Sequence, residues 1–264
     1  LDKEPESRKE AAISLAQKHG FKIENINVNT STAQWEIAED GKTLIQPFSS
    51  IKGLGDKAIE QIMNNRPFNA VEDLLFNEEV VYSKLNKKAL NALCLSGALD
   101  TLCDERFNGC KHFWMSCIND RPKNIKKLEE NIKEYSSEVD FTVEDKIENV
   151  SNITGMFPFD LVMTKDIKES IKRHRVPAVG SWDKNLGVAW FIPREIIAKR
   201  TKLGKLYWIL KVVDDTSTTT SIKCWGIKDD DRIHLNRPYA AKLDHSEDWG
   251  FSTRSIRHTF KLLG

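Results

Sequence analysis

The chain has 264 residues, 30% of them charged and 40% hydrophobic, and its formal net charge at pH 7 is +1. This length predicts two or three compact units, and the nearly balanced charge excludes a global basic field, so any nucleic-acid binding must depend on local clusters. No apolar run approaches about 18 residues, which excludes a membrane-spanning helix. No secretory pattern opens the chain, which excludes an export signal. The start at Leu1 suggests a piece of a longer protein.

The first predicted elements are a helix over residues 5–19, a strand over 21–28 and a short hairpin over 35–45. Gly20 ends the helix, and the residues after it alternate in polarity as a strand does. Asp40-Gly41 forms the turn of the hairpin.

From Pro47 the pattern becomes helical. Apolar residues recur at helical spacing over 59–63, which predicts the first helix of this region. Further helices are expected around 71–75, over 87–95 with Asn86 as the N-cap, and through most of 104–135.

Residues 136–180 are predicted to be a connector that includes a short basic helix over 165–175. After Pro177 the polarity alternates with a period of two, and short strands at regular spacing favour a small β-barrel. The fold class is therefore multidomain α and β, in which a helical region precedes the barrel. The expected strands lie over 188–197, 206–213 and 221–225, with further β segments near 239–243 and 249–260.

The sharpest local motif is Ile51-Lys52-Gly53-Leu54-Gly55, followed closely by Lys57. Two glycines around one apolar residue allow a tight hairpin between two helices, with Leu54 in their joint and the backbone open to a ligand. The N–H groups and dipole of the following helix favour a phosphate, and Lys52 and Lys57 add positive charge. Such contacts hold a DNA backbone without reading bases. The alternative is an ordinary helix connection in which glycine only provides its backbone angles.

The second candidate site is a basic β-hairpin beside aromatic residues. Its cations would follow phosphates while aromatic faces stack bases, at about 1–3 kcal/mol for each base. Trp190 and Phe191 could extend this surface, but alternation turns about half of each strand inward, so the aromatic residues could instead fill the barrel core. Tyr207 and Trp208 are adjacent, and one of them should face outward. The site comprises Lys199, Arg200, Lys202, Lys205, Tyr207, Trp208 and Trp225.

No catalytic or metal centre is visible in the sequence. The carboxylates of Asp214-Asp215 and Asp229-Asp230-Asp231 follow strands, where solvated turns explain them better than metal binding. There is no P-loop, G-x-S-x-G or H-E-x-x-H motif, so no catalytic residue and no cofactor are expected here. The odd cysteine count fits a reducing, cytoplasmic setting, and four of the cysteines, near His112, lack the C-x-x-C spacing of structural zinc. The five are Cys94, Cys103, Cys110, Cys117 and Cys224.

Four segments, in this order, resemble the C-terminal part of the bacterial DNA polymerase III alpha subunit, a C-family replicative polymerase. Residues 26–37 resemble the end of its fingers, and 51–58 its helix-hairpin-helix signature. Residues 85–100 resemble the run that follows, and 200–215 the start of its OB-fold. The resemblance extends through nearly the whole chain. The sequence is rich in Asn and Lys, which suggests a divergent member of the family, such as a phage polymerase.

This resemblance divides the chain into a fingers-like segment (1–45), a helix-hairpin-helix DNA-binding region (46–115), a helical connector (116–180) and an OB-fold (181–264). It implies that the helix-hairpin-helix region holds duplex DNA and that the OB-fold contacts single-stranded template. The polymerase (nucleotidyltransferase) centre with its Mg²⁺-binding aspartates would precede Leu1. The expected partners are therefore duplex and single-stranded DNA and a catalytic polymerase portion or subunit. A sliding clamp stays open as a further partner, although the connector has no glutamine-led clamp motif.

Two other interpretations remain open. One is a stand-alone adaptor for repair or recombination, built from a helix-hairpin-helix and an OB-fold; such an adaptor has no use for the fingers-like segment. The other makes the barrel a module for protein or RNA binding. A strong preference for RNA over DNA of equal length would support it.

Overall fold

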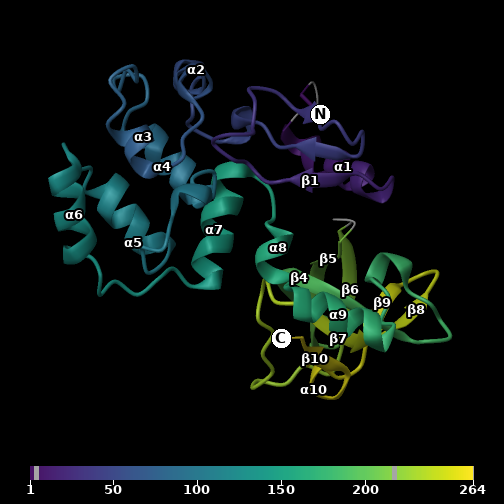
Figure 1. Ribbon diagram of the computed structural model, residues 1–264. Coiled ribbons are helices and arrows are strands. Elements are labelled where there is room, and N and C mark those ends of the chain that lie inside the picture. The colour runs from purple at the N-terminus through teal and green to yellow at the C-terminus, as the bar shows by residue number, and fades with distance from the viewer. Residues whose placement is uncertain (3–5, 216–218, 264) are drawn as a thin grey trace. The chain divides into compact units, whose positions relative to one another are not determined.

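A computed structural model describes residues 1–2, 6–215 and 219–263, which form two compact units. The first unit comprises Leu1–Pro5 and His19–Pro158, and the second comprises Glu6–Lys18 and Phe159–Gly264. The first unit is mainly helical and the second contains a large sheet (Figure 1). The predicted mixture of a helical region and a later β region is therefore confirmed. In the described part of the chain, no helix is both long and apolar enough to cross a membrane.

The first unit begins with a small three-stranded sheet in the order β1-β3-β2, in which β1 is parallel to β3. The strand predicted over residues 21–28 is wrong in length, because β1 covers only three of them. Beyond β1, the backbone N–H of Val28 donates to the carbonyl of Ala98 at 2.9 Å, so this stretch joins the helical core instead of a sheet. The strands are β1 (Lys22–Glu24), β2 (Glu36–Ile37) and β3 (Thr43–Ile45).

Short helices make up the rest of the first unit and enclose one apolar core. The predicted cap is confirmed, because the Asn86 side chain accepts from the N–H of Ala89 and starts α4. At the other end Gly97 has φ +84°, and the N–H of Ala98 reaches the carbonyl of Leu93 as in a Schellman motif. The elements are η1 (Phe48–Ser50), α2 (Asp56–Asn65), α3 (Val71–Leu75), α4 (Lys87–Leu95), η2 (Asp100–Leu102), α5 (Cys110–Trp114), η3 (Met115–Asn119), α6 (Ile125–Glu134) and α7 (Val143–Thr154).

The long helix expected over 104–135 is wrong, since α5 passes into the π-helical turn η3 and stops before α6 begins. Pro122 lacks an N–H and disfavours helical angles at the residue before it, which explains the break. The buried amide of Asn131 then donates to the carbonyls of Ser116 and Asp120, at 3.0 and 2.6 Å. These bonds satisfy the carbonyl groups that the interrupted helix leaves open.

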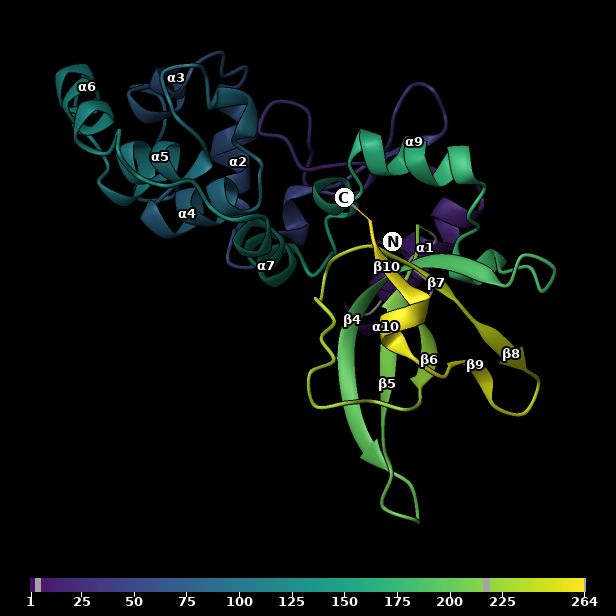
Figure 2. The ribbon, with the colours of Figure 1, turned by 90° about the horizontal axis from the view of Figure 1, so that it is seen from below.

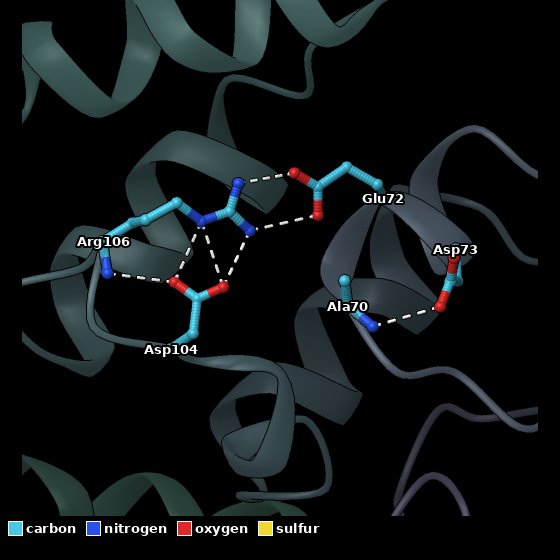
Figure 3. Close-up of polar contacts among 5 residues, drawn as sticks. All are labelled: Ala70, Glu72, Asp73, Asp104 and Arg106. Atoms are coloured by element: carbon cyan, nitrogen blue, oxygen red, sulfur yellow. Dashed lines mark hydrogen bonds and ion pairs between the residues drawn. The ribbon is translucent and has the colours of Figure 1, made fainter.

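A fork of ion pairs ties α3 to the loop after η2 (Figure 3). The guanidinium of Arg106 donates to both carboxylate oxygens of Glu72, at 2.6 and 3.1 Å, and also to Asp104. Hydrogen bonds from Arg106 lower the pKa of both carboxyl groups below their usual values. Beside this fork, Asp73 accepts from the N–H of Ala70 at the start of α3.

The second unit contains a curled seven-stranded sheet in the order β10-β7-β4-β5-β6-β9-β8 (Figure 2). All of its strand pairs are antiparallel except β6 with β9. The elements are α1 (Glu6–Lys18), α8 (Phe159–Val162), α9 (Lys165–His174), η4 (Val179–Ser181), β4 (Val188–Arg200), β5 (Leu206–Val213), β6 (Thr220–Cys224), β7 (Tyr239–Lys242), β8 (Asp244–Ser246), β9 (Gly250–Thr253), α10 (Ile256–Thr259) and β10 (Phe260–Leu262).

The long strand β4 is responsible for much of this curl. Its first residues, Val188 to Phe191, pair with β7, and from Ile192 onward it pairs with β5. The pairing register shifts between Pro193 and Glu195, which marks a β-bulge. A bulge bends a strand and tolerates a proline that has no N–H for the ladder. The sheet therefore bends around a second apolar core, to which Phe191, Leu210 and Ile222 contribute fully buried side chains.

Candidate nucleic-acid interface

The glycine hairpin joins η1 to α2. Gly53 lies in the left-handed region with φ +87°, and the N–H of Leu54 donates to the carbonyl of Ile51 at 3.2 Å. Leu54 is buried, as expected for a residue in the joint of a hairpin, while Lys52, Gly53, Gly55 and Lys57 are exposed. The helix predicted around residues 59–63 is α2, but the hairpin does not join two full helices, because η1 before it is only a three-residue turn.

The N-terminus of α2 is available to a ligand at this hairpin. Gly55 is the N-cap and offers no side chain to the first N–H groups of α2. The backbone N–H of Lys52 donates to the carbonyl of Ile153 at 2.9 Å, which fastens the loop to the end of α7. The hairpin thus combines a fixed backbone with an uncapped positive end of a helix dipole.

Lys88 is a third cation at the hairpin that the sequence analysis missed. A Cβ atom built on Gly53 would lie 3.4 Å from Cε and 3.9 Å from Nζ of Lys88, so the lysine side chain lies over the glycine backbone. Lys88 belongs to α4, 35 positions after Gly53, and only the packing of α4 brings it here. Three cations therefore meet at the hairpin: Lys52 from its loop, Lys57 from α2 and Lys88 from α4.

The basic β-hairpin is formed by β4, residues 201–205 and β5, and it extends outward at one end of the second unit (Figure 2). Lys199 pairs directly with Tyr207 across the two strands. Lys199, Arg200, Lys202 and Lys205 are exposed. Arg200 also donates to the carbonyl of Gly204 at 2.9 Å, so this cation closes the turn as well as carrying charge.

The alternation of β5 decides which of its two adjacent aromatic residues faces outward. Trp208 lies on the same face as the fully buried Leu210 and packs against the second core. Tyr207 lies on the opposite face, where its ring stacks on Trp225 with centroids 4.6 Å apart. Trp190 and Phe191 are 4% and 0% exposed, so the suggestion that they extend the surface is wrong.

Two further residues on this outer face were missed by the sequence analysis. Lys223 lies on β6 and Trp225 directly follows that strand, two positions later, so both side chains point to the same side of the sheet. The ammonium of Lys223 lies 4.8 Å from the ring centroid of Trp249, which is 68% exposed in the turn between β8 and β9. The alternation of side chains along a strand could have placed Lys223 on this face from the sequence. Trp249 comes close to Lys223 only because β6 pairs with β9.

Burial raises the pKa of the cysteines, and both ring nitrogens of His112 have hydrogen-bonding partners. Burial raises the pKa of Cys103 and Cys224 to about 12, so both thiols are protonated at neutral pH. One ring nitrogen of His112 accepts from the N–H of Asn108, and the other lies 2.8 Å from the carbonyl oxygen of Ile132. In the described residues, no three His, Cys, Asp or Glu side chains are grouped so that they could hold a metal ion.

Asp214 and Asp231 were expected to lie in solvated turns, but both are buried, so that expectation is wrong for them. Asp214 is 0% exposed and accepts from the backbone N–H of Gly180 at 2.7 Å. Asp231 is 4% exposed and accepts from the N–H of Lys228 and from Nε of Arg257, each at 2.8 Å. Both carboxylates therefore hold loops of the second unit in place.

Comparison with known proteins relates the first unit to a family. Residues 20–108 match the family model of the helix-hairpin-helix motif. Similar relatives include the PolC-type DNA polymerase III of Lacticaseibacillus paracasei, 32% identical over 91 residues, which are 33% of this chain and 6% of that protein. The DNA polymerase III subunit alpha of Pseudomonas fluorescens is 28% identical over 114 residues, which are 43% of this chain and 10% of that protein.

The PolC-type DNA polymerase III of Mycoplasmopsis pulmonis is 40% identical over 73 residues, which are 26% of this chain and 5% of that protein. The chain thus spans about a tenth or less of the length of these relatives. Among solved structures, the p204 HINb domain aligns over 42% of this chain and 57% of its own length at a TM-score of 0.25 and 16% identity, a likeness too slight to assign a fold. Residues 20–108 carry a helix-hairpin-helix motif, and the N-terminal part of the chain resembles, at modest identity, the bacterial DNA polymerase III alpha and PolC-type subunits.

Proposed function

We propose that this chain is a DNA-binding portion of a C-family replicative DNA polymerase. The observation that carries the proposal is the exposed Gly53 hairpin with its three cations, located inside the segment that matches the helix-hairpin-helix model. The similarity of the N-terminal part of the chain to DNA polymerase III subunits supports the polymerase context. The proposed partners are DNA and a catalytic polymerase portion or subunit, which supplies the Mg²⁺-dependent chemistry, and the proposed setting is cytoplasmic.

In this proposal the hairpin holds duplex DNA by its backbone. The uncapped N–H groups of α2 and the dipole of that helix favour a phosphate oxygen. Because Gly53 and Gly55 carry no side chains, a phosphate can approach the backbone closely. Lys52, Lys57 and Lys88 then neutralise neighbouring phosphates, and this grip is independent of base sequence.

The sheet of the second unit holds single-stranded template and is proposed to be an OB-fold. Its outer face presents the stacked pair of Tyr207 and Trp225, on which a base can stack in turn. The exposed cations of the β4–β5 hairpin line the same end and can follow the backbone of the strand. Aromatic faces combined with cations are what sequence-independent binding of single strands requires.

The experiment that tests this function is binding of the chain to a fluorescent primer–template junction, to blunt duplex and to single strand across a salt series. A preference for the junction, together with affinity that falls steeply as salt rises, is the expected result. Failure to bind any of the three would contradict the proposal that these two sites hold DNA.

A stand-alone DNA-binding adaptor is the second candidate. The specific observation in its favour is that the polymerase alignments cover 43% of this chain or less. Mixing the chain with a catalytic polymerase portion separates the two. Restored synthesis on a primed template supports the polymerase portion, whereas DNA binding without association or synthesis supports the adaptor.

A further inference from the structure

We propose that α9 carries an additional phosphate-binding surface, a lysine stripe formed by Lys165, Lys168 and Lys172, which holds a long single-stranded DNA after it leaves the sheet. The proposal rests on the proposed function, because it takes DNA as the ligand. It adds a contact that neither the glycine hairpin nor the outer face of the sheet provides.

Positive charge is concentrated on this helix. Residues 165–175 contain five cations and two acids, while the whole chain has a net charge of +1. Ile167 anchors the helix at 8% exposure, and the three lysines of the stripe are exposed. Their spacing of three and four residues places them on one face, over about 10 Å of helix at about 1.5 Å per residue.

The stability of the helix does not explain this arrangement. Lys165 is the first helical residue and Lys168 follows within one turn, where the helix dipole disfavours cations. Lys168 pairs with Asp160 at 3.0 Å, but both side chains are more than half exposed, so the pair adds little. Lys165 and Lys172 form no ion pair with another residue that the structure describes. Lys165 and Lys172 are therefore free to bind a ligand, and the exposed ion pair of Lys168 opposes binding only weakly.

An open groove lies beside the stripe and could seat the ligand. Its volume is about 410 Å³, and its lining includes the three lysines together with the side chains of Met163 and Thr164. Asp160 and Glu169 also line it, so the positive charge exceeds the negative by one. Flexible lysines bind phosphates as point charges without demanding a fixed geometry, which suits a mobile single strand.

The position of α9 makes the contact dependent on the length of the DNA. The chain after α9 joins the start of β4, where the N–H of Trp190 donates to the carbonyl of Pro177 at 2.9 Å. From Trp190, β4 runs ten residues to Arg200, which is at most about 33 Å at about 3.3 Å per residue. Figure 2 shows α9 and the β4–β5 hairpin toward opposite ends of the second unit. A short strand on the outer face should not reach both.

The test compares oligonucleotides of about 6 and about 30 nucleotides, because an OB-fold occupies roughly 4 to 16. The variant is Lys165→Gln with Lys168→Gln and Lys172→Gln. The matched control replaces three exposed lysines of the first unit, Lys123→Gln with Lys126→Gln and Lys133→Gln. Circular dichroism verifies that all three proteins are folded.

We expect the α9 variant to bind the long strand about tenfold more weakly at low salt, with a salt slope that is smaller by about 2, since each phosphate contributes about 0.7 for single strands. Binding of the short strand should be unchanged, as should both affinities of the control. Equal affinity of the variant and the wild type for the long strand overturns the proposal, and so does an equal loss in variant and control. Absence of binding by the wild type overturns the proposed function itself and this inference with it.

Discussion

The ring of Tyr207 on β5 stacks on that of Trp225, which follows β6, with centroids 4.6 Å apart and 25° between the ring planes. The two residues are 18 positions apart in the chain, and the antiparallel pairing of Trp208 with Cys224 brings them together. The two rings are nearly parallel, and neither belongs to the apolar core of the sheet. They form a flat surface on which a base can stack.

Removing this platform should weaken single-strand binding selectively. For Tyr207→Ala with Trp225→Ala we expect a loss of about 1–3 kcal/mol for each base that stacks there, or roughly 5- to 150-fold in affinity. Duplex binding should change little, because the glycine hairpin is untouched. Fluorescence anisotropy with both DNAs measures the difference, and Tyr135→Ala on the first unit is the control. Equal losses on both DNAs would show that the pair only stabilises the sheet.

Reversing the charges of the glycine hairpin should have the opposite selectivity. Lys52→Glu with Lys57→Glu places two negative charges at the uncapped end of α2, so we expect duplex affinity to fall while single-strand affinity is nearly retained. The salt slope for duplex should decrease by about 2, since each lost phosphate contact removes about 0.9. The control is Lys126→Glu with Lys133→Glu. An equal loss of affinity for single-stranded DNA would refute the proposal that the first unit binds duplex and the second binds single strands.

The exposed cations of the β4–β5 hairpin provide a third test. Reversal of Lys199, Arg200 and Lys202 to glutamate should reduce single-strand affinity and its salt slope. Because Arg200 also closes the turn, Arg200→Gln alone is needed to separate lost charge from a loosened hairpin. Titrations at several salt concentrations measure the slope. If the slope does not change, the hairpin faces away from the DNA.

The ion pairs of Arg106 predict a pH-dependent contribution to stability. Since Arg106 lowers the pKa of Glu72 and Asp104, the folded state favours their charged forms, and this stabilisation is present at neutral pH. It is lost as the pH falls through the range in which the two carboxyl groups bind protons. For Arg106→Met we expect unfolding to require about 0.5–1 kcal/mol less at neutral pH, because these side chains are partly exposed.

Urea unfolding at about pH 7 and at about pH 2.5 measures this contribution. The difference between wild type and Arg106→Met should shrink at the lower pH. Lys126→Met, which removes an exposed lysine, is the control and should show no such trend. A difference that stays constant with pH would mean that packing of the Arg106 side chain, and not its charge, stabilises the fold.

The sequence by itself determined the local features of this protein. Asn86 caps α4, Gly53 takes the left-handed conformation of the hairpin and Leu54 is buried in its joint, all as the residue types require. The change from helical to alternating periodicity near Pro177 correctly separated the helical region from the sheet. These features depend on neighbours within a few positions, so the linear pattern contains the information needed.

Tertiary structure alone decided which distant side chains meet. The sequence does not show which of Tyr207 and Trp208 faces the core. The pairing of β5 with β4 and β6 turns Trp208 toward it. Lys88 reaches Gly53 because α4 packs beside the hairpin, and Trp249 reaches Lys223 because β9 pairs with β6. Burial of Asp214 likewise depends on a contact with Gly180, 34 positions away. Contacts over such separations are selected by the packing of the whole unit, which no local propensity encodes.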